Sequence, residues 1–454
     1  MHEEGAVILP EAAPDEPFVH TGRPPDPTVR ELQREPNPLR RALRIAGPGL
    51  VAGAADDDPS GIGTYAQAGA QFGYATLWLM PLLLPFMIAV QYLCARIALV
   101  SGRGLADVMK RRYPRPLVLT LVGSLLVVNV ITAGADVGAM AAAAGLFVPV
   151  GPLVLILAVT AGLLLLQLFV GYAAAATIFR WLALALVGYV VSGILARPDP
   201  GAVLRGAVLP TISFDPSYVG IVVAVLGTTI NPYLFFWQAS MEVEEQVAKG
   251  RWRLWQRQGA TDSELRYRAW DVSAGMLFSQ LVAFFIVMCA GATLWRTGQH
   301  DITSAAQAAE SLRPMAGSLA HVLFAVGILG TGILAVPVLT GSAAYALSET
   351  FEWPFGLDAP PYRAPQFYAI IVLATLAAMG FDLLGIDPMR ALVLSSALSG
   401  LLTPPLLVLL MRLGNDPTVM GERTNGRLLN VLGWTMTGVM TLAALALVGT
   451  TILG

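Results

Sequence analysis

Long apolar segments alternate with short polar ones along almost the whole chain. A helix needs about 20 apolar residues to cross the hydrocarbon core of a bilayer, and the sequence offers eleven segments of this kind. They lie near residues 45–70, 75–99, 117–146, 150–171, 177–196, 215–240, 270–294, 316–348, 366–385, 388–412 and 428–453. The alternation of single residues that is typical of a membrane β-barrel is missing. The pattern therefore predicts an all-α polytopic membrane protein.

Composition supports the membrane assignment and excludes other classes. The 454 residues are 56% apolar and 13% charged, whereas an ordinary soluble domain has roughly 45–50% and about 25%. Charge this sparse cannot cover a water-facing surface, which excludes a soluble enzyme. A net charge of −2 gives no basic field for nucleic acid. Cys94 and Cys289 both lie in apolar segments and are too few for a disulfide framework or a thiolate metal cage.

The placement of charge predicts how the chain is oriented. Residues 1–44 hold 14 of the 58 charged residues and read as a disordered tail, followed by a membrane domain at 45–454. With a cytoplasmic N-terminus, 22 of the 28 Lys and Arg residues fall inside and five outside, with Arg96 within a span. The richness in Ala, Leu, Gly and Arg is typical of a bacterial protein, so we expect the plasma (inner) membrane. At the cytoplasmic end of the sixth segment, the cluster of Glu242, Glu244 and Glu245 predicts a solvated helix end, or alternatively a group that gathers cations.

Two of the predicted helices are interrupted in mid-span, at Asp58-Pro59 and at Asn231-Pro232. Proline removes a backbone donor and clashes with the preceding turn, so each helix should unwind there. The breaks are five helices apart, which predicts two inverted five-helix repeats, at about 45–196 and 215–412, and an extra helix at about 428–453. Broken helices in matching positions of two repeats indicate the substrate site of a transporter. The alternative is that the prolines only kink two packed helices.

Three consecutive aspartates, Asp56, Asp57 and Asp58, lie in the first break. One carboxylate at mid-membrane costs roughly 2.5–3.5 kcal/mol, so the run needs an explanation. Neighbouring residues on a helix point about 100° apart and cannot share one ion. One interpretation makes Asp56 and Asp57 part of a water-filled vestibule, and the more specific one assigns the ion to Asp58, beside the proline. A carboxylate, unwound carbonyls and the Asn231 amide form an all-oxygen set that suits Mg²⁺, Mn²⁺ or Ca²⁺.

Several blocks of the sequence resemble the NRAMP family of divalent metal transporters. They are residues 47–74, 231–233, 237–240 and 420–434, and the resemblance spans residues 45–454. It implies a LeuT-type fold that transports by alternating access, with the metal held between the first and sixth helices. It also implies that the metal is the substrate and that the protein needs no cofactor.

The motifs that carry the resemblance depart from the family pattern at several positions. The family's Asp-Pro-Gly-Asn motif implies metal ligands at Asp58 and at Gly61, where the asparagine is missing. Its Met-Pro-His motif implies a ligand at Asn231, with Tyr233 in place of the histidine, and a carbonyl ligand of the family falls on Thr228. Loss of the thioether removes the ligand that favours soft metals.

The family's proton-linked residues are only partly present. Asp136 matches an acid that the family implicates in proton movement, but the nearby glutamate is Ala139 and the ninth helix has no arginine pair. A family glutamine corresponds to Ser396. The candidate metal residues are thus Asp58, Asn231, Thr228, Asp57 and Gly61, the candidate proton-pathway residues are Asp136 and Asp56, and Tyr233 and Ser396 are expected near the site.

Together these features predict a secondary transporter of a divalent metal cation, Mn²⁺ and/or Mg²⁺, with weak or no proton coupling. Its partners are the cation and the lipid bilayer; protons remain open, and the sequence does not indicate an oligomeric state. One alternative is an organic-solute transporter on the same fold, although the three aspartates would repel an anion at Ser60-Gly61. The other is a receptor-like relative without transport, since half of the usual metal ligands are missing.

Overall fold

The computed structural model describes residues 47–169, 186–313, 317–357, 359–382 and 385–453. The predicted tail and the first part of the predicted fifth helix, residues 177–185, lie outside these ranges. Within them, nine helices are long and apolar enough to cross a membrane. These nine match nine of the eleven predicted segments, and the remaining two segments are the first, which is broken, and the fifth.

Each predicted segment coincides with one helix or with a broken pair. The first comprises α3 (Pro48–Asp56) and α4 (Pro59–Phe72), and the sixth comprises α11 (Pro216–Thr229) and α12 (Pro232–Ala248). The described part of the fifth is the helix Leu186–Leu195. The others are α5 (Leu79–Ser101), α7 (Arg115–Ala144), α8 (Pro152–Phe169), α14 (Asp262–Thr293), α17 (Ala320–Phe351), α18 (Pro365–Asp382), α19 (Pro388–Gly414) and α21 (Arg427–Leu453).

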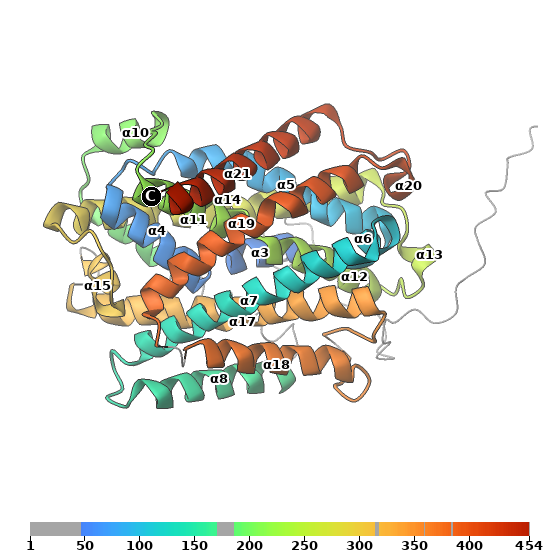
Figure 1. The fold of residues 1–454 in the computed structure, drawn as a ribbon, viewed down its shortest axis with the longest axis horizontal. Helices are drawn as coiled ribbons and strands as arrows, with labels where there is room; N and C mark the ends of the chain where they lie inside the picture. Colours follow the sequence, from blue (N-terminus) through green and yellow to red (C-terminus); the bar gives the residue numbers. More distant parts are fainter. Residues whose placement is uncertain (1–46, 170–185, 314–316, 358, 383–384, 454) are drawn as a thin grey trace, which may run out of the picture.

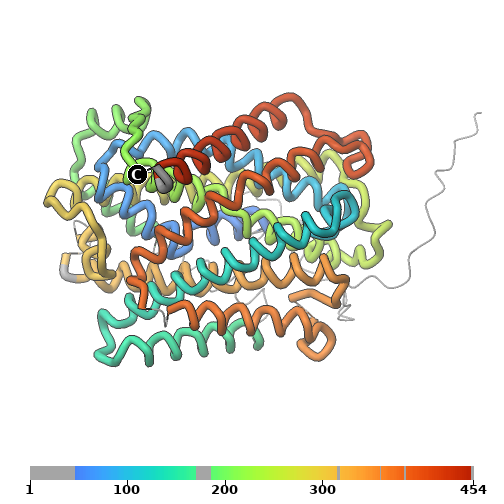
Figure 2. The backbone as a smooth tube through the Cα atoms, viewed as in Figure 1, coloured from blue at the N-terminus to red at the C-terminus, as the bar shows by residue number. Residues whose placement is uncertain are grey.

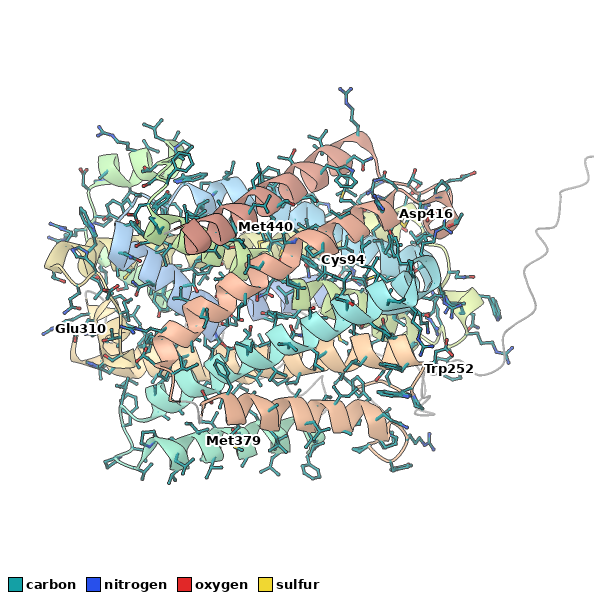
Figure 3. All side chains as sticks on the ribbon, viewed as in Figure 1. Cys94, Trp252, Glu310, Met379, Asp416 and Met440 are labelled. Atoms are coloured by element: carbon teal, nitrogen blue, oxygen red, sulfur yellow. The ribbon has the colours of Figure 1, made fainter. Side chains whose placement is uncertain are left out.

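Short connecting helices gather at the two ends of the bundle (Figure 1). At one end lie α6 (Leu105–Arg112), α13 (Leu254–Arg257) and α20 (Pro417–Met420), and at the other lie α10 (Pro200–Val208) and α15 (Ala305–Glu310). Figure 3 shows the same separation, with Asp416 and Trp252 at one end and Glu310 at the other. The first end carries the basic loops that the charge count assigns to the inside. The cytoplasmic orientation of that end stays a prediction.

The broken helices lie in the middle of the bundle, and the unbroken ones surround them (Figures 1 and 2). The α11–α12 pair is 89% buried over its most apolar stretch, whereas α8 is 11% buried. Helices α8 and α18 pack on α7 as an outer layer, and α14 packs against α3 and α4. A helix that is buried on all sides can carry polar groups that lipid would not tolerate.

Glycines let both broken helices approach their neighbours at backbone distance. A methyl group at Gly53 of α3 would overlap the carbonyl of Gly275 on α14, and one at Gly227 of α11 would overlap the carbonyl of Ser396 on α19. Small residues at such crossings are the usual means of close helix packing in membranes. The two breaks are therefore held in place by tight backbone contacts on either side.

A buried ionic cluster fixes the start of α3. Arg268 on α14 is 2% exposed, and its guanidinium lies 2.8 Å from Glu242 Oε1 and 2.7 Å from Asp271 Oδ2 and also pairs with Glu245. Asp271 Oδ2 accepts a second hydrogen bond, 2.8 Å long, from the amide of Gly49 in the first turn of α3. Glu242 is fully buried, so the expectation of a solvated helix end is wrong for this residue, because Arg268 compensates its charge.

Replacement of Arg268 should destabilise the fold strongly. In Arg268→Met, three carboxylates lose their shared cation, and breaking a buried ion pair costs about 3–5 kcal/mol. The matched control is Arg423→Met, whose partner Asp262 is 81% exposed, so that solvent screens the pair and its loss should change stability little. Thermal unfolding in detergent should show a clear drop in midpoint for the first variant only. Equal unfolding midpoints for the two variants would contradict the conclusion that the cluster stabilises the fold.

Candidate metal site

Both helix breaks follow the same local rule, a polar residue in extended conformation before a proline. Asp58 has φ −66° and ψ 168°, and Pro59 begins α4; Asn231 has φ −91° and ψ 125°, and Pro232 begins α12. Proline excludes the helical conformation from the residue before it, which explains both extended residues. Each break leaves the last carbonyls of one half-helix and the first amides of the next without helical partners.

Asp58 caps the amino end of α4 with its side chain. Its Oδ1 accepts hydrogen bonds from the Gly61 amide at 2.6 Å and from the Ser60 hydroxyl at 2.7 Å, and the side chain is fully buried. Its Oδ2 lies 3.4 Å from the Tyr233 hydroxyl. A carboxylate at a helix amino end is stabilised by the amides and by the helix dipole. These contacts therefore offset part of the cost of burying the Asp58 carboxylate in the interior of the bundle.

Three oxygens surround the position that a Cβ atom would take at Gly61, and we call this position the three-oxygen space. A Cβ atom there would lie 3.2 Å from the Asp56 carbonyl oxygen, 3.2 Å from Thr228 Oγ1 and 3.3 Å from Asp58 Oδ1. These atoms come from α3, from α11 and from the break itself. Thr228 Oγ1 is buried and has no hydrogen-bond partner among the described residues. A carbonyl, a hydroxyl and a carboxylate form a donor set that suits a hard cation.

Tyr233 connects the second break to the first. Asn231 is 3% exposed and makes no capping hydrogen bond with its side chain, so its amide does not cap α12. The Tyr233 hydroxyl donates to the Ala55 carbonyl at 2.9 Å, and the Tyr233 carbonyl accepts from Ser342 on α17 at 2.8 Å. Two half-helices and α17 are thus joined at one tyrosine.

Asp56 and Asp57 point to a different neighbour from Asp58. Both carboxylates accept from the Ser279 hydroxyl of α14, Asp56 at 2.6 Å and Asp57 at 3.2 Å. Both are buried, at 1% and 0% exposure, so a wide vestibule does not surround them. One oxygen of each remains unpaired within the described part of the chain. Asp57 as a ligand and Asp56 as a proton carrier stay predictions.

Asp136 and Ser396 both contact α4, the half-helix that begins beside Asp58. Asp136 Oδ1 accepts from the Ser60 amide at 3.0 Å, so Asp136 on α7 meets the amino end of α4 beside Asp58. The Ser396 hydroxyl of α19 accepts from Thr64 at 2.9 Å. The described residues contain no group of three or more His, Cys, Asp or Glu side chains that could hold a metal. A bound cation would therefore depend on backbone, hydroxyl and amide oxygens as well as on Asp58.

Sequence reasoning did not assign Ser60, Ser279 or the Ala55 carbonyl to the metal site. Ser60 could have been found, because its position two residues after a helix-capping aspartate allows its hydroxyl to reach that carboxylate. Ser279 and Ala55 contact residues 223 and 178 positions away, and no local pattern reports contacts at such distances.

Comparison with known proteins places the whole membrane domain in one group. The family model described as natural resistance-associated macrophage protein-like (Nramp) matches residues 49–450. The chain is 28% identical over 435 residues to the divalent metal cation transporter MntH of Deinococcus radiodurans, with 94% of each protein covered. It is also 28% identical over 430 residues to the MntH of Mycobacterium tuberculosis, with 92% of this chain and 94% of that protein covered.

Solved structures agree on the fold. The manganese transporter of Eremococcus coleocola superimposes with a TM-score of 0.69 at 18% identity, over 90% of this chain and 86% of that one. Mhp1, a nucleobase-cation-symport-1 family transporter, gives a TM-score of 0.53 at 13% identity, over 88% and 91% of the two chains. The predicted LeuT-type fold, with inverted repeats and an added helix, is confirmed.

A methyl group at Gly61 should close the three-oxygen space. Gly61→Ala places carbon within 3.3 Å of all three oxygens, so we expect divalent cation binding to weaken at least about tenfold, the equivalent of about 1.4 kcal/mol. Alanine favours a helix over glycine, and the fold should survive. The control is Gly220→Ala on α11, where an added Cβ meets nothing within 4 Å. Isothermal titration of both variants checks the prediction; equal affinities would contradict it.

Proposed function

Because this chain belongs to the natural resistance-associated macrophage protein-like (Nramp) family, we propose that it is a secondary transporter that moves a divalent metal cation across the membrane by alternating access. Members of this family are membrane transporters and not enzymes. The metal is then the substrate, and the protein needs no cofactor. The curated relatives named divalent metal cation transporter MntH support this substrate class.

The observation that carries the proposal is the buried oxygen cluster between the two helix breaks. Asp58 supplies the charge, and the Asp56 carbonyl and the unpaired Thr228 hydroxyl face the same space at Gly61. We propose Asp58, Thr228 and Asn231 as direct ligands, with the backbone around Gly61 and Asp57 completing the site. A hydroxyl without a hydrogen-bond partner is costly in the interior unless a ligand satisfies it.

The donor types favour Mn²⁺ and Mg²⁺ as the transported ions. All candidate donors are oxygens, and Asn231 stands where the family has a methionine sulfur. Hard oxygen donors bind Mg²⁺ and Mn²⁺ well and give soft ions such as Cd²⁺ no advantage. The similar protein of Eremococcus coleocola is a manganese transporter, which supports Mn²⁺ as a transported ion. We further propose a multi-pass protein of the plasma membrane, with a cytoplasmic N-terminus and repeats at about 45–196 and 215–412.

Transport is proposed to be weakly coupled to protons or uncoupled. Tyr233, Ala139 and Ser396 replace polar or titratable residues of the family, and residues 366–382 of the ninth helix contain no arginine. The membrane potential contributes about 2.3 kcal/mol per charge at 100 mV, and a divalent ion gains twice that. This is enough for inward accumulation without protons.

Loss of the Asp58 charge should abolish transport. Asp58→Asn keeps the shape of the side chain but removes the anion, and we expect Mn²⁺ uptake to fall to the background of empty vesicles. The measurement is quenching of a metal-sensitive dye inside proteoliposomes, with Mg²⁺ and Cd²⁺ as competitors. The control is Asp387→Asn, a surface cap of α19 that asparagine also serves. Undiminished uptake by Asp58→Asn, or none by the parent protein, would contradict the proposal.

Metal influx should not acidify the vesicle interior. The signal of a pH-sensitive dye enclosed in the proteoliposomes should stay constant while Mn²⁺ or Mg²⁺ enters, because the chain lacks most of the family's proton-linked residues. Acidification that scales with metal uptake and disappears in Asp136→Asn would instead establish proton coupling through Asp136.

A further inference from the structure

The Tyr233 hydroxyl lies between the two breaks and contacts both sides of the first one. It donates to the Ala55 carbonyl at 2.9 Å and lies 3.4 Å from Asp58 Oδ2. The side chain is 1% exposed, and Ser342 holds its backbone carbonyl from α17. The hydroxyl is therefore held by two contacts with the first break, and Ser342 holds the backbone that carries the ring.

This contact determines which carbonyls of the unwound segment are free. The last carbonyls of α3 have no helical partner, because the helix ends at Asp56. The Ala55 carbonyl accepts the Tyr233 proton, whereas the Asp56 carbonyl faces the space at Gly61. Without the phenol, the Ala55 carbonyl would lose this partner and become available beside the Asp56 carbonyl.

The number of available oxygens matters most for the larger cations. Ca²⁺ takes six to eight oxygen ligands at about 2.3–2.6 Å in flexible geometry, whereas Mg²⁺ needs six at about 2.0–2.1 Å. A site with fewer and firmly held protein oxygens disfavours Ca²⁺ more than Mg²⁺. The Tyr233 hydroxyl removes one oxygen from the site and also ties the end of α3 to α12, so both effects act in the same direction.

We propose that Tyr233 is a positioning residue that excludes Ca²⁺ from the site by occupying the Ala55 carbonyl. This inference rests on the proposed function, because it concerns the selectivity of the same site. Tyr233 does not bind the ion; it acts through the carbonyl that it blocks and through the Asp58 carboxylate that it touches.

The test compares two buried tyrosines in the full-length protein. Tyr233→Phe removes the hydroxyl and keeps the ring; the matched control is Tyr65→Phe, whose hydroxyl bonds to Thr229 at 2.9 Å. Isothermal titration with Ca²⁺, Mg²⁺ and Mn²⁺ gives the Kd of each ion. One hydrogen bond is worth about 1 kcal/mol, so the ratio of Ca²⁺ to Mg²⁺ affinity should rise about fivefold in Tyr233→Phe and change less than about twofold in Tyr65→Phe.

The outcomes separate this inference from the proposed function. A residue that served stability alone would weaken all three ions alike, so an unchanged ratio in folded Tyr233→Phe overturns the proposal. The parent protein supplies a second check that does not depend on the variant folding: it should bind Mg²⁺ more tightly than Ca²⁺, and the reverse order overturns the inference too. A parent protein that binds no divalent cation would contradict the proposed function itself.

Discussion

Lipid cannot form hydrogen bonds, and this constraint governs the centre of the molecule. Each helix break leaves backbone groups unpaired in mid-membrane, where every unsatisfied group costs several kcal/mol. The chain meets the constraint by surrounding both breaks with other helices and by supplying side-chain partners such as Asp58 and Tyr233. Among the described residues, the buried hydroxyl of Thr228 has no hydrogen-bond partner, and this oxygen is then available to a ligand. The candidate site lies between the two breaks, where such an oxygen has no hydrogen-bond partner in the described part of the chain.

Carboxylates repeatedly meet the amino ends of the short half-helices. Asp58 accepts from Gly61 and Asp136 accepts from Ser60, both at the start of α4, and Asp271 accepts from Gly49 at the start of α3. The positive end of a helix dipole stabilises such a charge. The half-helices therefore allow several acidic groups to share a region of low dielectric constant, which one continuous helix with a single amino end could not provide.

The sequence predicts the parts of this structure that depend on local chemistry. Apolar length gives the spans, and a polar residue before proline gives both breaks, because proline acts on its immediate neighbours. It does not predict that Tyr233 blocks the Ala55 carbonyl or that Ser279 bridges Asp56 and Asp57, since these partners are 178 to 223 positions apart. It also misjudges Glu242, because a glutamate near a helix end is usually solvated and the buried Arg268 comes from another helix.

The shortness of α3 has a consequence for biogenesis. Nine residues of helix are about 14 Å long, less than half of the hydrocarbon core, and the aspartates that follow make the segment a poor substrate for insertion by the translocon. Its partner on α14 is synthesised 222 residues later, which takes roughly 10–45 s at 5–20 residues per second. The hydrogen bond that holds the start of α3 therefore cannot form until that long after the first segment has been made.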